Sequence, residues 1–349
     1  MRFRVLTAKT YIKSTQYIQS VLLSCASTMS RPKVYITRPD CPKIAIEMLK
    51  EKCSVEIWHK ESPVPREELL KQVKGIDGLF CLLTDKVDMA VLDSAGPTLK
   101  VIGTMSVGYD HIDVDEVKRR GIKLGYTPEV LTDAVAELTI SLLLATSRRL
   151  FEAHQEILSG GWGSWSPLWM CGSGLKGSTV GVVGFGRIGQ EVAKRLKTFN
   201  ISKLIYTSRT EKPEAVAIGG IHVTLDQLLS ESDFIIVTCA LTPETKEMFN
   251  DELFSKMKPS AIFINTSRGG VVKQESLQRA LESGKIKAAG LDVMTPEPLP
   301  PDHPLLKLKN CVIIPHIGSA TLQARTDMAI LTAQNILNGL EKKPLPAEV

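Results

Sequence analysis

The sequence predicts an α/β protein built from two doubly wound parallel-sheet domains. Two stretches, residues 33–125 and 180–314, alternate short apolar runs with amphipathic helical segments. Strands that alternate with helices in this way form parallel sheets covered by helices on both faces. With 349 residues, of which 43% are hydrophobic, the chain is long enough for two separate cores.

The first stretch is predicted to form a complete α/β unit. Its expected strands are Val34–Thr37, Val55–Trp58, Leu79–Leu83, Val101–Thr104 and Ile122–Gly125. Its expected helices are Lys43–Lys50, Arg66–Val73 and Val114–Arg119. One long helical pattern then runs from about Asp133 to Leu158, and a Gly- and Trp-rich segment, residues 160–177, follows it.

The second stretch repeats the alternation. Its expected strands begin at Val180 and continue with Leu204–Thr207, Phe234–Cys239, Ala261–Asn265, Ala288–Val293 and Val312–Ile314. Helices are expected near Leu225–Glu231, Thr245–Lys256 and Gln274–Ser283. A last helical pattern, Thr321–Leu340, comes after this unit has ended, so it can return to the first domain and make that domain discontinuous. We therefore expect one domain at 32–131 and 322–349, a second at 132–321, and an extension at 1–31.

A glycine-rich turn opens the second unit. A short strand of β-branched residues leads into Gly184-x-Gly186-x-x-Gly189, and an amphipathic helix follows. Gly184 allows a tight turn, Gly186 allows backbone N–H groups to approach a pyrophosphate, and Gly189 allows close packing of helix on strand. The helix N-terminus, with Arg187 and Ile188, would then face the phosphates. A bare motif of this kind is often an ordinary turn, but the strand and helix around it favour dinucleotide binding.

Charge and composition exclude several classes of protein. Four of the 43 basic residues precede Met29, which leaves 39 basic against 38 acidic residues in the rest of the chain. This nearly neutral balance does not predict binding to nucleic acid. The longest apolar runs are far shorter than the roughly 20 residues of a membrane-spanning helix. The seven cysteines are scattered and are never spaced Cys-x-x-Cys. They are typical of reduced thiols in a cytoplasmic setting, and we predict neither disulfides nor a metal site.

The segment before Met29 has a composition of its own. It is rich in Ser and Thr, contains Arg and Lys, and lacks acidic residues, the first of which is Asp40. Such a composition is similar to a mitochondrial transit peptide. A disordered extension, or translation that begins at Met29, explains it equally well.

Three residues that can take part in catalysis or substrate binding follow expected strands of the second unit: Arg268, Glu297 and His316. Taken singly, each has an ordinary explanation as a surface charge, a turn residue or a structural histidine. Ligands bind at the carboxyl ends of strands in open parallel sheets, so all three should lie on the edge that carries the glycine turn. A His can protonate a developing alkoxide, a carboxylate beside it favours the imidazolium, and an Arg holds a carboxylate. Together they predict reduction of a 2-oxo acid by a nicotinamide cofactor.

From about Lys33 onward the chain resembles the D-isomer-specific 2-hydroxy acid dehydrogenases. The resemblance rests on four motifs in order: the glycine turn, Asn265–Gly269, Gly290–Val293 with Glu297-Pro298, and Pro315–Ser319. It implies a Rossmann cofactor domain inserted in a flavodoxin-like substrate domain, and a homodimer with the active site between the two domains.

The resemblance also assigns roles to individual residues. His316 would be the acid/base, Glu297 would raise its pKa, and Arg268 would bind substrate. Val107 and Gly108 would offer backbone N–H groups to the substrate carboxylate. Further substrate contact is expected from Ser319, and further cofactor contacts are expected from Ala240, Thr266, Asp292, which would hold the nicotinamide carboxamide, and Gly318.

Within the family the chain is most similar to the glyoxylate and hydroxypyruvate reductases, through residues 104–108 and 160–169. This implies reduction of these two acids to glycolate and D-glycerate. Another small 2-oxo acid is the enzymatic alternative, and a dinucleotide-sensing transcriptional corepressor of the same fold is the non-enzymatic one. The tryptophans of residues 160–169 suit dimer or domain packing, while Trp165 has a second interpretation, as a wall of the substrate pocket across a dimer interface.

The end of the second strand of the Rossmann unit indicates which cofactor is used. Sites for NAD usually place an acidic residue there, about 20 residues beyond the glycines, to bind the ribose. This chain has Ser208, Arg209, Thr210 and Lys212 at that place, which favours the 2′-phosphate of NADPH over NADH. Glu211 could reach the ribose if the strand ends later, and Arg209 could be a solvated loop charge.

Overall fold

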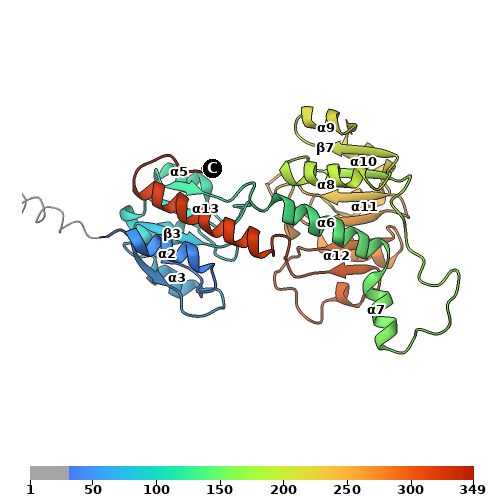
Figure 1. Ribbon diagram of the computed structural model, residues 1–349, viewed down its shortest axis with the longest axis horizontal. Coiled ribbons are helices and arrows are strands. Elements are labelled where there is room, and N and C mark those ends of the chain that lie inside the picture. Colours follow the sequence, from blue (N-terminus) through green and yellow to red (C-terminus); the bar gives the residue numbers. More distant parts are fainter. Residues whose placement is uncertain (1–30) are drawn as a thin grey trace, which may run out of the picture.

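The structure is a computed structural model that describes residues 31–349, so the predicted extension lies almost entirely outside the described residues. Two α/β lobes lie side by side (Figure 1), and each is built around one parallel sheet. The smaller sheet has the strand order β2-β1-β3-β4-β5, and the larger has β12-β11-β10-β9-β6-β7-β8. The predicted fold class, two doubly wound parallel-sheet domains, is confirmed.

The five-stranded sheet forms the core of the first lobe. Its strands are β1 (Lys33–Ile36), β2 (Ser54–Ile57), β3 (Gly78–Cys81), β4 (Val101–Thr104) and β5 (Lys123–Gly125). The helices between them are α2 (Lys43–Lys52), α3 (Arg66–Gln72), α4 (Met89–Ala95) and α5 (Val114–Arg119). The C-terminal helix α13 (Leu322–Leu340) packs on α2, β3 and β4 and thus returns to this lobe.

The seven-stranded sheet forms the core of the second lobe. Its strands are β6 (Thr179–Val183), β7 (Lys203–Thr207), β8 (Gly220–His222), β9 (Phe234–Val237), β10 (Ile262–Asn265), β11 (Ala288–Leu291) and β12 (Cys311–Ile313). The helices that accompany it are α6 (Thr132–Ser147), α8 (Arg187–Lys197), α9 (Pro213–Ala217), α10 (Leu225–Glu231), α11 (Asp251–Ser255) and α12 (Gln274–Glu282). Helix α6 enters this lobe from the first and packs on α8, β10 and β11.

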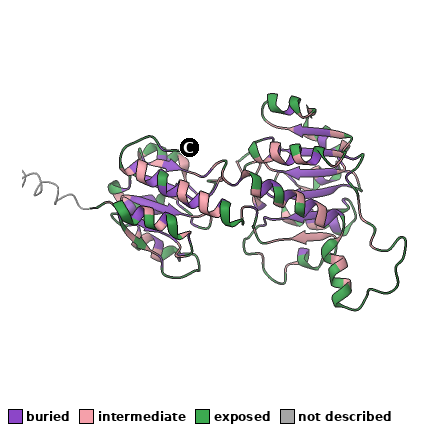
Figure 2. Cartoon of the chain, viewed as in Figure 1, coloured by how far each residue is buried: buried purple, intermediate pink, exposed green. Residues whose placement is uncertain are grey.

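Both sheets are covered on both faces, which explains why their central strands read as unbroken apolar runs. All four residues of β3, β4, β9 and β10 are buried, whereas the lobe surfaces are exposed (Figure 2). Separate hydrophobic clusters fill the space on either side of each sheet. Within residues 31–349 we find no helix that is long and apolar enough to cross a membrane.

Two predicted helices were wrong in extent. The single helix expected from Asp133 to Leu158 is interrupted at Arg149, which adopts a left-handed φ of 56°, and α7 (Leu150–Leu158) continues in a new direction. The helix expected at Thr245–Lys256 begins only at Asp251. There the side chain of Asn250 accepts hydrogen bonds from two free N–H groups of the first turn, so Asn250 is its N-cap.

Candidate active site

Two adjoining cavities lie between the lobes, at the carboxyl ends of the strands. The larger, of about 1010 Å³, follows the glycine turn, and the smaller, of about 670 Å³, contains Arg268 and His316. Seven residues line both cavities, namely Val107, Tyr126, Ile188, Thr238, Cys239, Ala240 and Thr242. An elongated ligand can therefore extend from one cavity into the other.

The glycine turn has the geometry that a dinucleotide requires. Gly184 has a φ of 90°, and a Cβ there would lie 2.6 Å from the backbone of Cys239. A Cβ at Gly189 would lie 2.4 Å from the carbonyl oxygen of Gly184, so only glycine allows α8 to pack this closely on the turn. Gly186 has open space at its Cβ position and lines the larger cavity with Arg187. The N-terminus of α8 thus presents free N–H groups to that cavity.

The far end of the larger cavity is lined by the residues that follow β7. Ser208, Arg209, Thr210 and Lys212 all face it, whereas Glu211 does not. The segment is compact, because Ser208 Oγ donates to the carbonyl of Thr210 at 2.6 Å. The backbone N–H of Lys212 donates to the hydroxyl of Tyr206 at 2.8 Å. Arg209 and Lys212 therefore border this end of the cavity, and no carboxylate follows the strand directly. Glu244 lines the same cavity and interacts with the charge of Arg209.

His316 and Glu297 form a hydrogen-bonded pair beside the smaller cavity. His316 Nδ1 donates to Glu297 Oε2 at 2.7 Å, and the backbone N–H of Met294 donates to Glu297 Oε1 at 2.8 Å. Burial opposes ionisation of Glu297, but the hydrogen bond and charge of His316 outweigh it and hold the pKa of Glu297 below its usual range. Glu297 lies behind the ring and does not line the cavity itself. The arrangement leaves Nε2 of His316 as the ring nitrogen without a partner within residues 31–349.

The loop that carries His316 is held in an unusual conformation. His316 has a left-handed φ of 51°, which is rare for a non-glycine residue and often occurs at functional sites. The two oxygens of Asp292 accept the backbone N–H groups of Ile317 and Gly318 at 2.7 and 2.8 Å. Asp292 is almost fully buried and follows β11 directly. Its carboxylate therefore fixes the direction in which the His316 ring leaves the loop.

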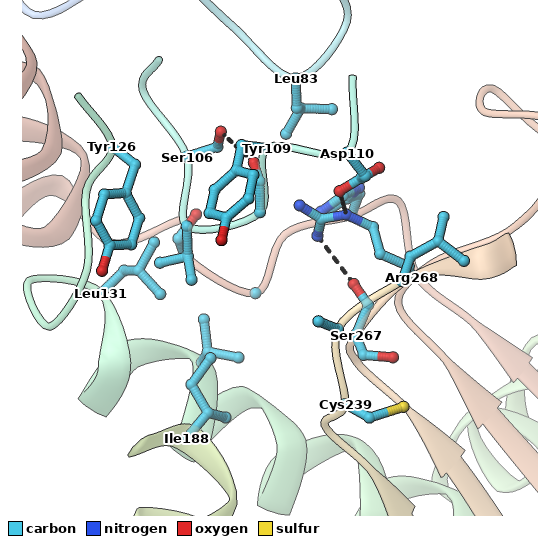
Figure 3. A pocket seen from close by; sticks show the side chains of 18 of the residues that line it. Leu83, Ser106, Tyr109, Asp110, Tyr126, Leu131, Ile188, Cys239, Ser267 and Arg268 are labelled. Atoms are coloured by element: carbon cyan, nitrogen blue, oxygen red, sulfur yellow. Dashed lines mark hydrogen bonds and ion pairs between the residues drawn. The ribbon is translucent and has the colours of Figure 1, made fainter. Parts of the chain in front are cut away.

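Arg268 reaches across from the second lobe to the first (Figure 3). Its Nε donates to Asp110 Oδ1 at 2.9 Å, and one terminal nitrogen donates to the carbonyl of Ser267 at 3.0 Å. The other terminal nitrogen lies against Gly108, where a Cβ would come within 1.9 Å of it. Asp110 thus orients the guanidinium toward the turn at Val107 and Gly108.

The structure brings nearly all of the predicted site residues together. The smaller cavity is lined by Val107, Gly108, Thr266, Arg268, Asp292, His316, Gly318 and Ser319. The larger is lined by Gly184, Gly186, Arg187, Ser208, Arg209, Thr210 and Lys212, and Ile188 and Ala240 line both. Gly189 lies behind the turn. Trp165 lines neither cavity of its own chain and is 83% exposed on the segment after α7, so the structure does not place it in the pocket of this chain.

Several cavity residues were missed by sequence reasoning. Asp110 is one, and others are Ser106, Tyr109, Tyr126 and Arg325. Arg325 comes from the first turn of α13, and burial lowers its pKa while the charge of Asp292 acts in the opposite direction. The polar residues that follow the buried strand β4, among them Ser106, Asp110 and His111, were the available signal for the first two. Within residues 31–349 no cluster of His, Cys, Asp and Glu has the arrangement of a metal site.

Comparisons with known proteins agree with this geometry. Residues 140–318 match the family model described as "D-isomer specific 2-hydroxyacid dehydrogenase, NAD binding domain". A glyoxylate reductase/hydroxypyruvate reductase of Mus musculus is 57% identical, covering 85% of this chain and 91% of the relative. The protein of the same name from Homo sapiens is 54% identical, and the match covers 91% of this chain and 97% of that relative. The solved NADPH-dependent glyoxylate/hydroxypyruvate reductase of Sinorhizobium meliloti, in complex with NADP and malonate, is 30% identical with a TM-score of 0.79, covering 92% of this chain and 97% of that one.

The fold and the two cavities define an oxidoreductase that uses a nicotinamide dinucleotide. The chain belongs to the D-isomer specific 2-hydroxyacid dehydrogenase family.

Proposed function

We propose that this protein reduces glyoxylate and hydroxypyruvate to glycolate and D-glycerate with NADPH. The observation that carries the proposal is the joint presence of His316, backed by Glu297, and Arg268 in a cavity that adjoins the dinucleotide cavity. The names of the mouse and human relatives support the choice of substrates. In this proposal residues 32–131 and 322–349 form the substrate domain, and residues 132–321 form the cofactor domain.

The substrate carboxylate is bound by groups from both lobes. Arg268 offers two terminal nitrogens, a planar fork that suits a carboxylate. The backbone N–H groups of Val107 and Gly108 donate to no group within residues 31–349, so they are available as well. Ser319 completes this end of the cavity. Asp110 accepts from Nε of Arg268, and the carbonyl of Ser267 accepts one N–H of a terminal nitrogen. The remaining N–H groups of the two terminal nitrogens are left for the substrate.

His316 supplies the proton. The cofactor, when bound, provides the hydride that reduces the carbonyl carbon. Nε2 of His316 donates its proton to the carbonyl oxygen as negative charge develops there, which is general acid catalysis. The carboxylate of Glu297 at Nδ1 stabilises the imidazolium that precedes this transfer. Asp292 keeps the ring aimed into the cavity through its bonds to Ile317 and Gly318.

The cofactor is held along the larger cavity. Gly184, Gly186, Arg187 and Ile188 would hold the pyrophosphate, and Ala240, Thr266, Asp292 and Gly318 would hold the nicotinamide end. Ser208, Arg209, Thr210 and Lys212 would take the 2′-phosphate. Two findings support NADPH over NADH: no strand-end carboxylate repels a phosphate, and Glu211 does not line the cavity. Arg209 lines the cavity and is exposed, so the Arg209→Ala variant decides between binding of the 2′-phosphate and a solvated loop charge.

The protein forms a homodimer in this proposal. Helix α7 and the segment after it expose large apolar side chains, namely Leu150, Phe151, Ile157, Leu158, Trp162, Trp165, Leu168 and Trp169. Helix α7 and the segment after it project from the second lobe (Figure 1). An exposed apolar surface of this kind usually meets a partner. Because Trp165 does not reach the pocket of its own chain, it can line only that of a second copy. Sedimentation should show a dimer, and Trp165→Ser should raise KM for the 2-oxo acid more than KM for NADPH.

Residues 1–30 lie outside the described residues, and their role is tested separately. A fluorescent fusion of residues 1–32 should enter mitochondria if the segment is a targeting peptide, while protein that starts at Met29 should stay in the cytoplasm and be active. A diffuse fluorescent signal from the fusion would rule out the targeting peptide. The two remaining explanations would then be a disordered extension and translation that begins at Met29.

Steady-state rates with a panel of small 2-oxo acids, each with NADPH and NADH, test the proposed function. We expect the highest kcat/KM for glyoxylate and hydroxypyruvate with NADPH. A higher kcat/KM for another 2-oxo acid would select the enzymatic alternative. Dinucleotide binding without turnover of any acid would select the corepressor alternative.

A further inference from the structure

We propose that a chain of three side chains, His111–Thr104–Ser106, positions the backbone turn at Val107–Gly108 for the substrate carboxylate. This inference rests on the proposed function, because that proposal assigns substrate binding to the turn. The three are positioning residues. In this proposal the backbone N–H groups of the turn contact the substrate carboxylate, and the three side chains only hold the turn in place.

The chain is continuous and lies behind the turn. His111 Nε2 is 3.0 Å from Thr104 Oγ1, and Thr104 Oγ1 is 2.8 Å from Ser106 Oγ. Ser106 Oγ donates to the carbonyl oxygen of Gly108 at 2.7 Å. Thr104 is fully buried, so bulk water does not offer its hydroxyl an alternative partner, and Ser106, at the edge of the cavity, is only 4% exposed. Thr104 is the last residue of β4, which ties the chain to an inner strand of the five-stranded sheet.

The chemistry of the groups fixes the direction of every hydrogen bond. A carbonyl oxygen can only accept, so the single proton of Ser106 goes to Gly108. Ser106 Oγ must then accept the proton of Thr104, and Thr104 Oγ1 must accept from His111 Nε2. His111 is therefore protonated at Nε2. Burial lowers the pKa of His111 to about 4, with the charge of Arg268 acting in the same direction and that of Asp110 opposing it, so the ring is neutral near pH 7.

The turn is anchored at both ends and free in the middle. The carbonyl of Ser106 accepts from the backbone N–H of Thr127 at 2.9 Å, and the carbonyl of Gly108 accepts from the Ser106 side chain. Between these anchors, the N–H groups of Val107 and Gly108 donate to nothing within residues 31–349. Ser106 thus uses its side chain to fix the peptide group that follows Gly108, while its carbonyl holds the peptide group that carries the Val107 N–H. The peptide group that carries the Gly108 N–H lies between these two fixed groups. Two parallel donors bind a carboxylate well only when they are held in one orientation.

Thr104→Val tests the proposal, because valine has the shape of threonine without the hydroxyl. It removes the acceptor of His111 and the donor to Ser106. We expect KM for glyoxylate to rise about 3- to 10-fold, the effect of one ordinary hydrogen bond, while KM for NADPH changes less than twofold. Thr104→Ser keeps the hydroxyl and should restore KM for glyoxylate to within about twofold of wild type. Thr146→Val is the matched control, because the buried Thr146 hydroxyl on α6 has no partner within residues 31–349 and Thr146 lines neither cavity.

A second variant protects the test against misfolding. Ser106→Ala removes the last bond of the chain directly and should raise KM for glyoxylate by a similar factor. Because both variants break one chain, the double variant should cost less than the product of the two single effects. The melting temperature of each protein shows whether it is folded.

Two results would overturn the inference. One is an unchanged KM for glyoxylate in both Thr104→Val and Ser106→Ala. The other is a rise in KM for both glyoxylate and NADPH in Thr104→Val together with an equal rise in Thr104→Ser, which would indicate a merely structural role. The proposed function would fail in a different way, because wild-type protein would then reduce neither glyoxylate nor hydroxypyruvate.

Discussion

Replacement of Glu297 by Gln removes a charge from the acid–base pair while keeping its size. The Glu297 carboxylate lies 2.7 Å from His316 Nδ1. Two unit charges at that separation attract by about 1.5 kcal/mol even at the dielectric constant of water. Hydrogen bonds to charged groups are worth roughly 1.5–3 kcal/mol, and about 1.4 kcal/mol corresponds to one pKa unit. The side chains of His316 and Glu297 are about one-quarter exposed. We therefore use this range of interaction energies and not the larger energy of a fully buried ion pair.

We therefore expect the alkaline limb of kcat/KM for reduction to move about 1–2 pH units toward acid in Glu297→Gln. The sign follows from the reaction: reduction needs protonated His316, and the lost carboxylate favoured that form. The limb cannot belong to Glu297, because the pKa of Glu297 is held below its usual range by His316 against the effect of burial. The assay is kcat/KM for glyoxylate with NADPH between about pH 5.5 and 10. Glu275→Gln, an exposed carboxylate on α12, is the control, and a limb at the same pH in wild type and Glu297→Gln would refute the reasoning.

Three further predictions concern the remaining site residues. His316→Ala should lower kcat by roughly 10²- to 10⁴-fold while NADPH still binds, and near-full turnover would rule out its role as the acid. Arg268→Lys should lower kcat/KM for glyoxylate severely, because a point charge cannot replace a two-pronged guanidinium; unchanged kcat and KM would contradict carboxylate binding by Arg268. Arg209→Ala should weaken NADPH binding by about one to two decades and leave NADH nearly unaffected, and equal losses for both cofactors, measured by titration, would exclude recognition of the 2′-phosphate.

The sequence predicted the parts of the site that depend on strand ends. Arg268, Glu297 and His316 each follow a strand of one parallel sheet, and such strands end on the same edge, so their proximity did not require knowledge of side-chain contacts. The Arg268–Asp110 pair could not be predicted in this way. It joins residues 158 positions apart on different lobes, and only the arrangement of the lobes brings them together.

The break in the long helical pattern could not be predicted from the spacing of apolar residues. The apolar spacing continues through Arg149, so periodicity gave no reason to end the helix there. The guanidinium of Arg149, which has a left-handed φ, donates to both oxygens of nearby Glu152. One of its nitrogens also donates to the carbonyl of Cys171, a contact 22 positions away that periodicity does not reveal. After the break, α7 has no buried residue, and its side chains Leu150, Phe151, Ile157 and Leu158 are exposed.

Asp292 shows how one residue can link cofactor and acid. The family resemblance implies contact with the nicotinamide carboxamide, and the structure adds that both of its oxygens already accept backbone N–H groups of the His316 loop. These roles are compatible, because each carboxylate oxygen can accept more than one hydrogen bond. Burial raises the pKa of Asp292, the two N–H bonds and the charge of His316 lower it, and the charge of Glu297 raises it, with burial dominant. The anchor of the loop is thus sensitive to the charges on the acid–base pair, and a cofactor that contacts Asp292 would act on the same group that aims His316.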